Sequence, residues 1–115
     1  METRMIVINR YYGGDFGLSA EAVWRLRELG CEEARRVTLS GEVGPDGEVM
    51  EYDVGYMRSL RRDDPLLVRV VEEMGTAADG VYAELMVVEI PADIEWVLHK
   101  DDGFETVEEA HRQWP

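Results

Sequence analysis

Apolar residues near the start of the chain recur first at strand spacing and then at helical spacing. Met5 to Ile8 is a short apolar run with β-branched residues, which predicts a first strand. Ser19 is a good N-cap and predicts a helix that continues to about Leu29, where Gly30 supplies a left-handed stop. The residues of this helix that are expected to face the core are Ala22, Val23, Leu26 and Leu29.

The middle of the chain predicts a hairpin followed by a second helix. Residues 36–43 and 49–56 have strand-like patterns and flank a turn signal at residues 44–47, so we expect a β-hairpin over residues 36–56. Asp64 and Pro65 then form a good helix start, and Gly75 or Gly80 ends the helix. Its buried stripe is predicted to contain Leu67, Val68, Val71 and Met74.

The last third of the chain predicts two strands and a final helix. Residues 81–90 are the longest β-like run and are predicted to form a central strand. A further strand over residues 94–99 is closed by the turn Asp101-Asp102-Gly103. Residues 106–109 (TVEE) have the spacing of a capping box, which predicts a short helix that runs toward Trp114.

The order of these elements predicts an α+β fold made of one domain over residues 1–115. We expect a mainly antiparallel sheet of about four to six strands, with two main helices on one face and a short C-terminal helix. A chain of 115 residues, 45% of them hydrophobic and 32% charged, has the composition of one folded domain. No internal repeat or low-complexity tract suggests a second domain.

Charge is divided unevenly along the chain. Its 12 basic and 25 acidic residues give a formal net charge of −13, and residues 63–115 hold three basic and fourteen acidic side chains. Such a surface as a whole repels duplex nucleic acid. Residues 1–62 hold nine arginines against eleven acids, so this half could still bind an anion. A bias toward arginine is also typical of a GC-rich or thermophilic source.

Targeting and redox signals favour the cytoplasm. No apolar run reaches the roughly 18 residues of a membrane span, and the first residues lack the long apolar region of a secretory signal. The single cysteine, Cys31, cannot form an internal disulfide, which is typical of a reducing compartment. We therefore expect a cytoplasmic protein that has no membrane partner.

The segment from Arg10 to Ser19 is the strongest candidate for a binding site. It follows a strand and opens a helix, so its backbone N–H groups could favour an anion, and its glycines allow close approach. Arginines from elsewhere would complete an anion pocket if their guanidinium groups converged. The predicted ligand-binding residues are Arg10, Tyr12, Gly13, Gly14, Phe16, Gly17, Ser19, Arg61, Arg62 and Arg112. The alternative is a structural turn with its tyrosines packed on the sheet and the arginines in surface ion pairs.

Residues capable of catalysis or metal binding form no known pattern. His99 and His111 are the only histidines, and no His or Cys spacing matches a zinc site. Cys31 follows a predicted helix C-terminus, where the dipole disfavours a thiolate. We therefore expect no enzyme activity, no metal and no cofactor. The tryptophans are expected in the core or at a subunit contact, which favours a homo-oligomer; they are Trp24, Trp96 and Trp114.

Several stretches of the chain are distinctive. Residues 8–19 read INRYYGGDFGLS, 62–68 read RDDPLLV, 70–75 read VVEEMG and 88–91 read VEIP, and the ending adds EW at 95–96, DGFE at 102–105 and HRQW at 111–114. Together they resemble a family of small uncharacterised proteins encoded by bacteriophages and other large DNA viruses. The segment 36–56 is the most variable part, and Asp15 stands where the family usually runs directly from glycine to phenylalanine. The resemblance implies a phage-type accessory protein that interferes with host defence.

The sequence leads to one functional hypothesis and leaves one alternative open. The hypothesis is sequestration, without turnover, of a small anionic ligand derived from a nucleotide, such as a host immune signal, by loop 12–19 and nearby arginines. The alternative is inhibition of a host nuclease or polymerase by the acidic second half, which would imitate nucleic acid in a basic groove. A nucleotide hydrolase would need a general base or a metal to which no motif points. Either function places the protein in the cytoplasm of a bacterial host.

Overall fold

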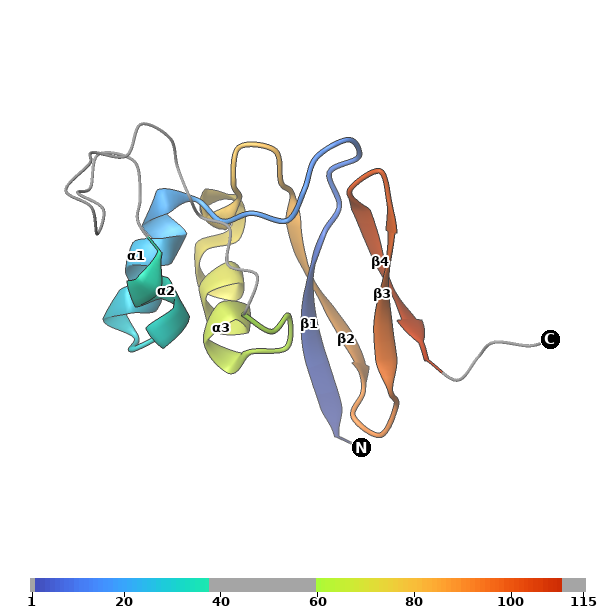
Figure 1. The fold of residues 1–115 in the computed structure, drawn as a ribbon. Helices are drawn as coiled ribbons and strands as arrows, with labels where there is room; N and C mark the ends of the chain where they lie inside the picture. The colour runs from blue at the N-terminus through green and yellow to red at the C-terminus, as the bar shows by residue number, and fades with distance from the viewer. Residues whose placement is uncertain (1, 38–59, 111–115) are drawn as a thin grey trace.

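The computed structural model describes residues 2–37 and 60–110 (Figure 1). Its helices are α1 (Ala20–Glu28), α2 (Glu32–Arg36) and α3 (Pro65–Met74), and a 3-10 turn, η1 (Gly75–Ala78), follows α3 directly. Its strands are β1 (Thr3–Asn9), β2 (Leu85–Pro91), β3 (Trp96–Asp101) and β4 (Phe104–Glu109). The hairpin expected over residues 36–56 lies outside the described residues except at its start, where Arg36 ends α2 instead of beginning a strand.

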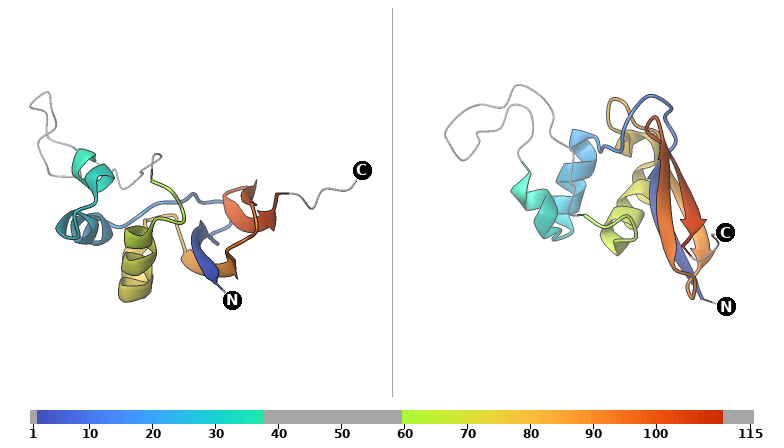
Figure 2. Two further views of the ribbon diagram at one scale, coloured as in Figure 1. Left: turned by 90° about the horizontal axis from the view of Figure 1, so that it is seen from below. Right: turned by 45° about the vertical axis from the view of Figure 1, so that its right-hand side comes forward.

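The described elements lie in layers, as Figures 1 and 2 show. α1 and α2 are outermost on one side, α3 lies between them and the strand pair β1–β2, and the β3–β4 hairpin lies on the far side of that pair. Both pairs are antiparallel, with Val7 opposite Val87 and Leu98 opposite Val107. The fold is therefore of the expected α+β type, and the described chain has four strands. They form two two-stranded sheets instead of one continuous sheet.

The main hydrophobic core lies between the helices and β1–β2. Leu26 of α1, Leu67 of α3 and Val7 of β1 are fully buried in it. Since side chains alternate along a strand, Ile6 and Ile8 point to the opposite face of β1, where the β3–β4 hairpin lies, and they are buried as well. Burial on both faces explains why this strand is an unbroken apolar run in the sequence.

The boundaries of α1 and α3 follow local signals. The hydroxyl of Ser19 accepts a backbone N–H from the first turn of α1, and Gly30 follows the helix with a φ of 92°. The carboxylate of Asp64 accepts two N–H groups at the start of α3, and Gly75 ends that helix. The predicted starts and ends of these two helices are confirmed. The sequence could predict them because a cap depends on residues within about one turn. The short α2 is an additional helix, with acids in its first turn and arginines in its last, which suits the helix dipole.

The apolar run at residues 81–90 forms a shorter and more peripheral strand than predicted. β2 begins only at Leu85, and Val81 and Tyr82 are exposed. The carbonyl of Tyr82 accepts the N–H of Asp15, so the segment before β2 bonds to the glycine-rich loop. Within the described ranges β2 pairs with β1 alone, so the expectation of a central strand is wrong.

The prediction of a helix from Thr106 onward is also wrong, because this segment belongs to β4. Asp102 (φ 51°) and Gly103 (φ 83°) form a two-residue turn that returns the chain onto β3, with Asp101 opposite Phe104. Pairing along the whole of β3 then determines the conformation of residues 104–109, and the capping-box spacing has no effect. Trp114 lies outside the described residues.

Candidate functional site

The loop predicted to bind a ligand is fixed by Asn9, the last residue of β1. The Asn9 side chain is fully buried, and its Oδ1 accepts the N–H groups of Tyr11 (3.1 Å) and Glu84 (2.9 Å). Its Nδ2 donates to the carbonyl of Gly103 at 2.8 Å and more weakly to that of Tyr11. One amide therefore joins the loop, the segment before β2 and the β3–β4 turn. It makes every hydrogen bond that burial demands of it, so its role is structural.

The backbone N–H groups of the loop are used inside the protein. Gly13 donates to the carbonyl of Asp102 at 2.6 Å, and Asp15 donates to that of Tyr82 at 3.0 Å. Gly14 donates within the loop, and the N–H of Phe16 is taken by the carboxylate of Asp15. The Ser19 hydroxyl both caps α1 and donates to a carbonyl of η1. These groups were expected to hold an anion, and the structure gives each of them an internal partner.

The glycines of this region allow backbone segments to touch. A Cβ built on Gly14 would overlap the carbonyl oxygen of Tyr82, and one built on Gly103 would overlap the carbonyl oxygen of Gly14. Gly17 has no neighbour within 4 Å of such a Cβ, although Gly80 packs directly against its backbone. The close approach at Gly14 therefore lets three loops of the same chain pack against one another. The sequence had suggested that this space would admit a ligand.

Arg62 is bound within a buried ion pair. Its guanidinium donates to both carboxylate oxygens of Glu105, at 2.5 and 3.0 Å, and lies 3.7 Å from the centre of the Phe16 ring. Glu105 is 1% exposed and also accepts the N–H of Asn9, while Arg62 is 14% exposed and donates weakly to the carbonyl of Val7. These contacts give hydrogen-bond partners to the N–H of Asn9 and the carbonyl of Val7 at the edge of β1 that faces away from β2, where a third strand could otherwise pair. Because Arg62→Ala would leave the buried Glu105 carboxylate without this partner, we expect that variant to lower the melting temperature.

The other predicted arginines do not converge with Arg62. Arg61 is mostly exposed and pairs with Asp63 at 2.8 Å, an ion pair that lowers the pKa of the Asp63 carboxyl. Arg10 lies 4.2 Å from the centre of the Phe104 ring, and Tyr12 lies 6.3 Å from the same ring. Arg112 lies outside the described residues. The structure thus brings together two separate pairs of predicted residues: Arg62 with Phe16, and Arg10 with Tyr12.

Exposed apolar side chains gather where the glycine-rich loop meets the turns of the strand layers. The exposed fractions are 63% for Tyr12, 79% for Val81 and 68% for Tyr82. Contacts around Gly14 hold these residues close to one another, because its backbone touches Tyr82, the Tyr11 ring and Gly103. We call this surface the aromatic end; it consists of Arg10, Tyr11, Tyr12, Val81, Tyr82 and Phe104. Sequence reasoning placed Tyr82 and Phe104 elsewhere, since nothing local shows that these segments meet the loop.

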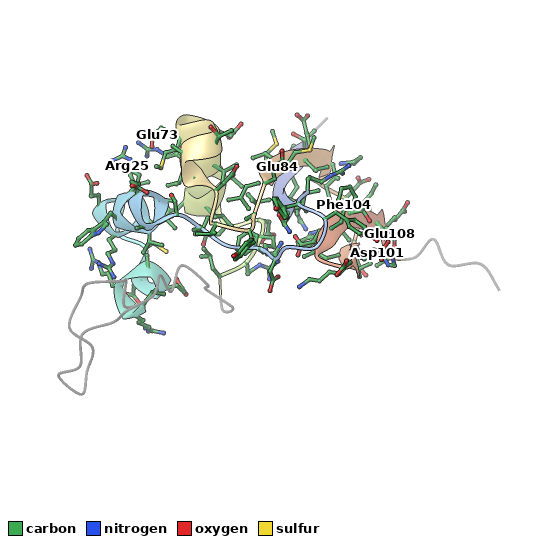
Figure 3. All side chains as sticks on the ribbon, turned by 90° about the horizontal axis from the view of Figure 1, so that it is seen from above. Arg25, Glu73, Glu84, Asp101, Phe104 and Glu108 are labelled. Carbon is green, nitrogen blue, oxygen red and sulfur yellow. The ribbon has the colours of Figure 1, made fainter. Side chains whose placement is uncertain are left out.

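The segment from Asp79 to Ala110 holds most of the net negative charge of the described chain. It contains ten carboxylates and one basic side chain, Lys100. Six of those carboxylates are exposed and have no ion pair within residues 2–37 and 60–110. We call them the strand-layer carboxylates; they are Glu84, Glu89, Asp93, Asp101, Asp102 and Glu108. In Figure 3 Glu84, Asp101 and Glu108 lie over the strands, around Phe104, whereas Arg25 and Glu73 lie over the helices.

A groove of about 720 Å³ lies between the start of β1 and the outer side of α3. Met5, Pro65 and Val68 line it, and Arg4 and Arg69 are its basic residues. It also holds three carboxylates, those of Asp63, Glu72 and Glu73, so its charge is mixed. None of the nine predicted ligand-binding residues that the structure describes lines this groove.

The described residues offer no group of three or more His, Cys, Asp or Glu side chains that could hold a metal ion. Burial raises the pKa of the Cys31 thiol, which disfavours its reactive thiolate form. Among the described helices, none is both long enough and apolar enough to cross a membrane. Trp24 is exposed and lies against Arg27, Trp96 is half-buried in β3, and the expected homo-oligomer stays a prediction.

No protein-family model, curated protein or solved structure matches the chain. Its function is therefore inferred from the surfaces described above.

Proposed function

We propose that this protein is a non-enzymatic inhibitor that binds a basic surface of another protein where that partner would otherwise bind nucleic acid. The observation that carries the proposal is the set of strand-layer carboxylates, six exposed acids that have no basic neighbour at ion-pair distance within residues 2–37 and 60–110. An acidic surface of this kind steers a basic partner toward it and repels nucleic acid. With the viral likeness of the sequence, the proposed target class is a host nuclease or polymerase.

The contrast with the helical segments supports this proposal. Residues 10–37 and 60–78 hold nine acidic and eight basic side chains, nearly in balance. Several of these form ion pairs, among them Arg25 with Glu73 at 2.9 Å and Arg61 with Asp63 at 2.8 Å. Residues 79–110 have only Lys100 to offset ten acids. Among the described residues the net negative charge is thus concentrated in the strand segment, where it can act on a partner.

Sequestration of a nucleotide-derived anion is the second candidate, and Arg10 is the observation that favours it. The Arg10 guanidinium has no carboxylate within ion-pair distance in the described part of the chain, and it lies over Phe104 beside Tyr12. A base could stack on these rings while Arg10 contacts a phosphate. The nearby Glu84, Asp101 and Asp102 would repel that phosphate, so we rank this function second.

The experiment is a titration of DNA cleavage by purified basic nucleases, with the full chain added at 50 and 300 mM salt. We expect inhibition that weakens at the higher salt concentration. Asp101→Asn with Glu108→Gln should weaken inhibition about threefold to tenfold at 50 mM, since exposed acids act through long-range attraction. Glu21→Gln with Glu72→Gln is the matched control, because it removes the same charge from exposed, unpaired acids of the helices.

Three results would contradict the proposed function. They are no inhibition of any nuclease tested, an equal loss in both double variants, and inhibition that does not depend on salt. Calorimetric titration with cyclic and linear nucleotides tests the second candidate independently. Measurable heat that Arg10→Ala abolishes would replace the leading proposal with sequestration.

A further inference from the structure

The aromatic end is the most exposed apolar surface that the structure describes on connected loops. Tyr12, Val81 and Tyr82 are each more than 60% exposed, and Tyr11 is 41% exposed. The hydroxyl groups of Tyr11, Tyr12 and Tyr82 form no hydrogen bond within the described residues. A contiguous patch of this kind often marks an interaction surface on a soluble protein. Tyrosine and arginine are also the residue types that contribute most to binding energy at protein interfaces.

The backbone beneath these rings is held rigidly. Buried Asn9 bonds to the backbone at Tyr11, Glu84 and Gly103, and the N–H of Gly13 donates to the carbonyl of Asp102. Three segments far apart in the sequence therefore keep fixed positions relative to one another. A surface that is already ordered loses little conformational entropy when it binds a partner.

The charge around the rings selects the chemistry of the partner. Glu84 is exposed on the same segment as Tyr82, and Asp101 and Asp102 are exposed on the hairpin that carries Phe104. Figure 3 shows Glu84 and Asp101 on either side of Phe104. The basic side chain at this end is Arg10, which lies over Phe104. A cation is attracted both by the ring faces and by the carboxylates, whereas an anion finds one cation without an ion pair, Arg10, among the described residues of this end.

We infer that the aromatic end binds an arginine-bearing segment of the partner, with guanidinium groups against the tyrosine rings and paired to the carboxylates beside them. Arg10 is an internal example of the ring contact in this geometry, because its guanidinium lies 4.2 Å from the centre of the Phe104 ring. Arginine fits better than lysine, since its planar group both stacks on a ring and binds a carboxylate through two N–H groups. The inference rests on the proposed function and names the part of the surface that carries it.

The test measures binding of the full chain to fluorescently labelled peptides of nine arginines or nine lysines by anisotropy. We expect the arginine peptide to bind more tightly than the lysine peptide at equal salt. Tyr12→Ala and Tyr82→Ala should each weaken the arginine peptide about threefold to fivefold, as expected for loss of one exposed cation–π contact, and should narrow the preference over lysine. Trp24→Ala is the matched control, since Trp24 is 52% exposed on α1, which lies on the far side of α3 from the strand pairs (Figure 1).

Charge variants separate this inference from the proposed function. Asp101→Asn with Asp102→Asn should weaken both peptides alike, and asparagine suits the positive φ of residue 102. If these variants weaken binding and the tyrosine variants do not, the inference is wrong while the proposed function stands. If no variant weakens binding, or neither peptide binds, both are wrong. A nucleotide that binds in place of the peptides and depends on Tyr12 would overturn the inference in favour of sequestration.

Discussion

The helical segments and the strand segment of this protein differ in how many of their charged side chains form ion pairs. In the helical segments the bidentate pair of Arg25 with Glu73 joins α1 to α3, and acids and bases are nearly equal in number. In the segment from Asp79 to Ala110 six exposed carboxylates lack such partners within the described residues. The net charge of the whole chain, −13, does not reveal this division. Among the described residues, the unpaired acids lie where no ion pair uses them to stabilise the fold, which is why we assign them to binding.

The largest expected effect comes from the ion pair that connects the two regions. Glu105→Gln leaves the Arg62 guanidinium buried without a carboxylate, so we expect the free energy of unfolding to fall by about 3–5 kcal/mol. The melting temperature should fall by roughly 10 °C or more. Thermal unfolding followed by circular dichroism measures this change.

Lys100→Gln is the matched control for that variant. Lys100 contacts the same carboxylate at 3.6 Å but is half exposed, so its removal should cost less than about 1 kcal/mol. An equally small loss in Glu105→Gln would show that the buried pair does not join the layers. A ligand role for Arg62 would then become open again.

The second effect concerns the contact between the glycine-rich loop and the β3–β4 turn. Gly103→Ala places a Cβ against the carbonyl of Gly14 at a positive φ, so we expect a loss of about 3 kcal/mol or more. Gly13→Ala has a positive φ but open space, and should cost about 1–2 kcal/mol. Gly17→Ala has neither problem and should be nearly neutral. Urea unfolding of the three variants measures the order, and equal effects would contradict the packing of these loops.

Sequence reasoning succeeded where a structure depends on neighbours in the chain. Ser19 and Asp64 were predicted as caps, and the turn at Asp102 and Gly103 was predicted from the same kind of local preference. It failed where a distant partner decides the outcome. Residues 106–109 have the spacing of a helix start, yet pairing with β3 places them in strand β4.

The candidate site was predicted less well than the fold, for the same physical reason. Arg62 was expected to face a ligand, but its carboxylate partner, Glu105, is 43 residues away and no local pattern links them. Tyr82 was counted as part of a buried strand because it stands in an apolar run, and it is 68% exposed. Alternation along β4 offers one missed signal, since it places Glu105 on the same inward face as Val107.

A smaller effect compares the removal of charge from the strand layer with its removal from the helical segments. Glu84→Gln with Asp101→Asn and Glu108→Gln should leave stability unchanged or raise it by less than about 1 kcal/mol at low salt, because these acids repel one another. The expected gain should shrink as salt is added. Thermal unfolding at 20 and 300 mM salt measures it, and a clear loss of stability would mean that these acids have structural partners.

The smallest effect is the pH dependence of the Arg25–Glu73 pair. The Arg25 guanidinium lowers the pKa of the Glu73 carboxyl from its model-compound value of 4.5, through hydrogen bonds first and charge second. The folded protein therefore binds this proton less tightly than the unfolded chain does. The stabilisation is present above about pH 4.5 and is lost as the pH falls through the lowered pKa of the folded state. Glu73→Gln should melt slightly below the wild type at pH 7, and the difference should shrink as the pH falls through the lowered pKa of Glu73. A difference that persists below that pKa would show that Glu73 acts through packing, and the contrast between paired helices and unpaired strands would lose one of its supports.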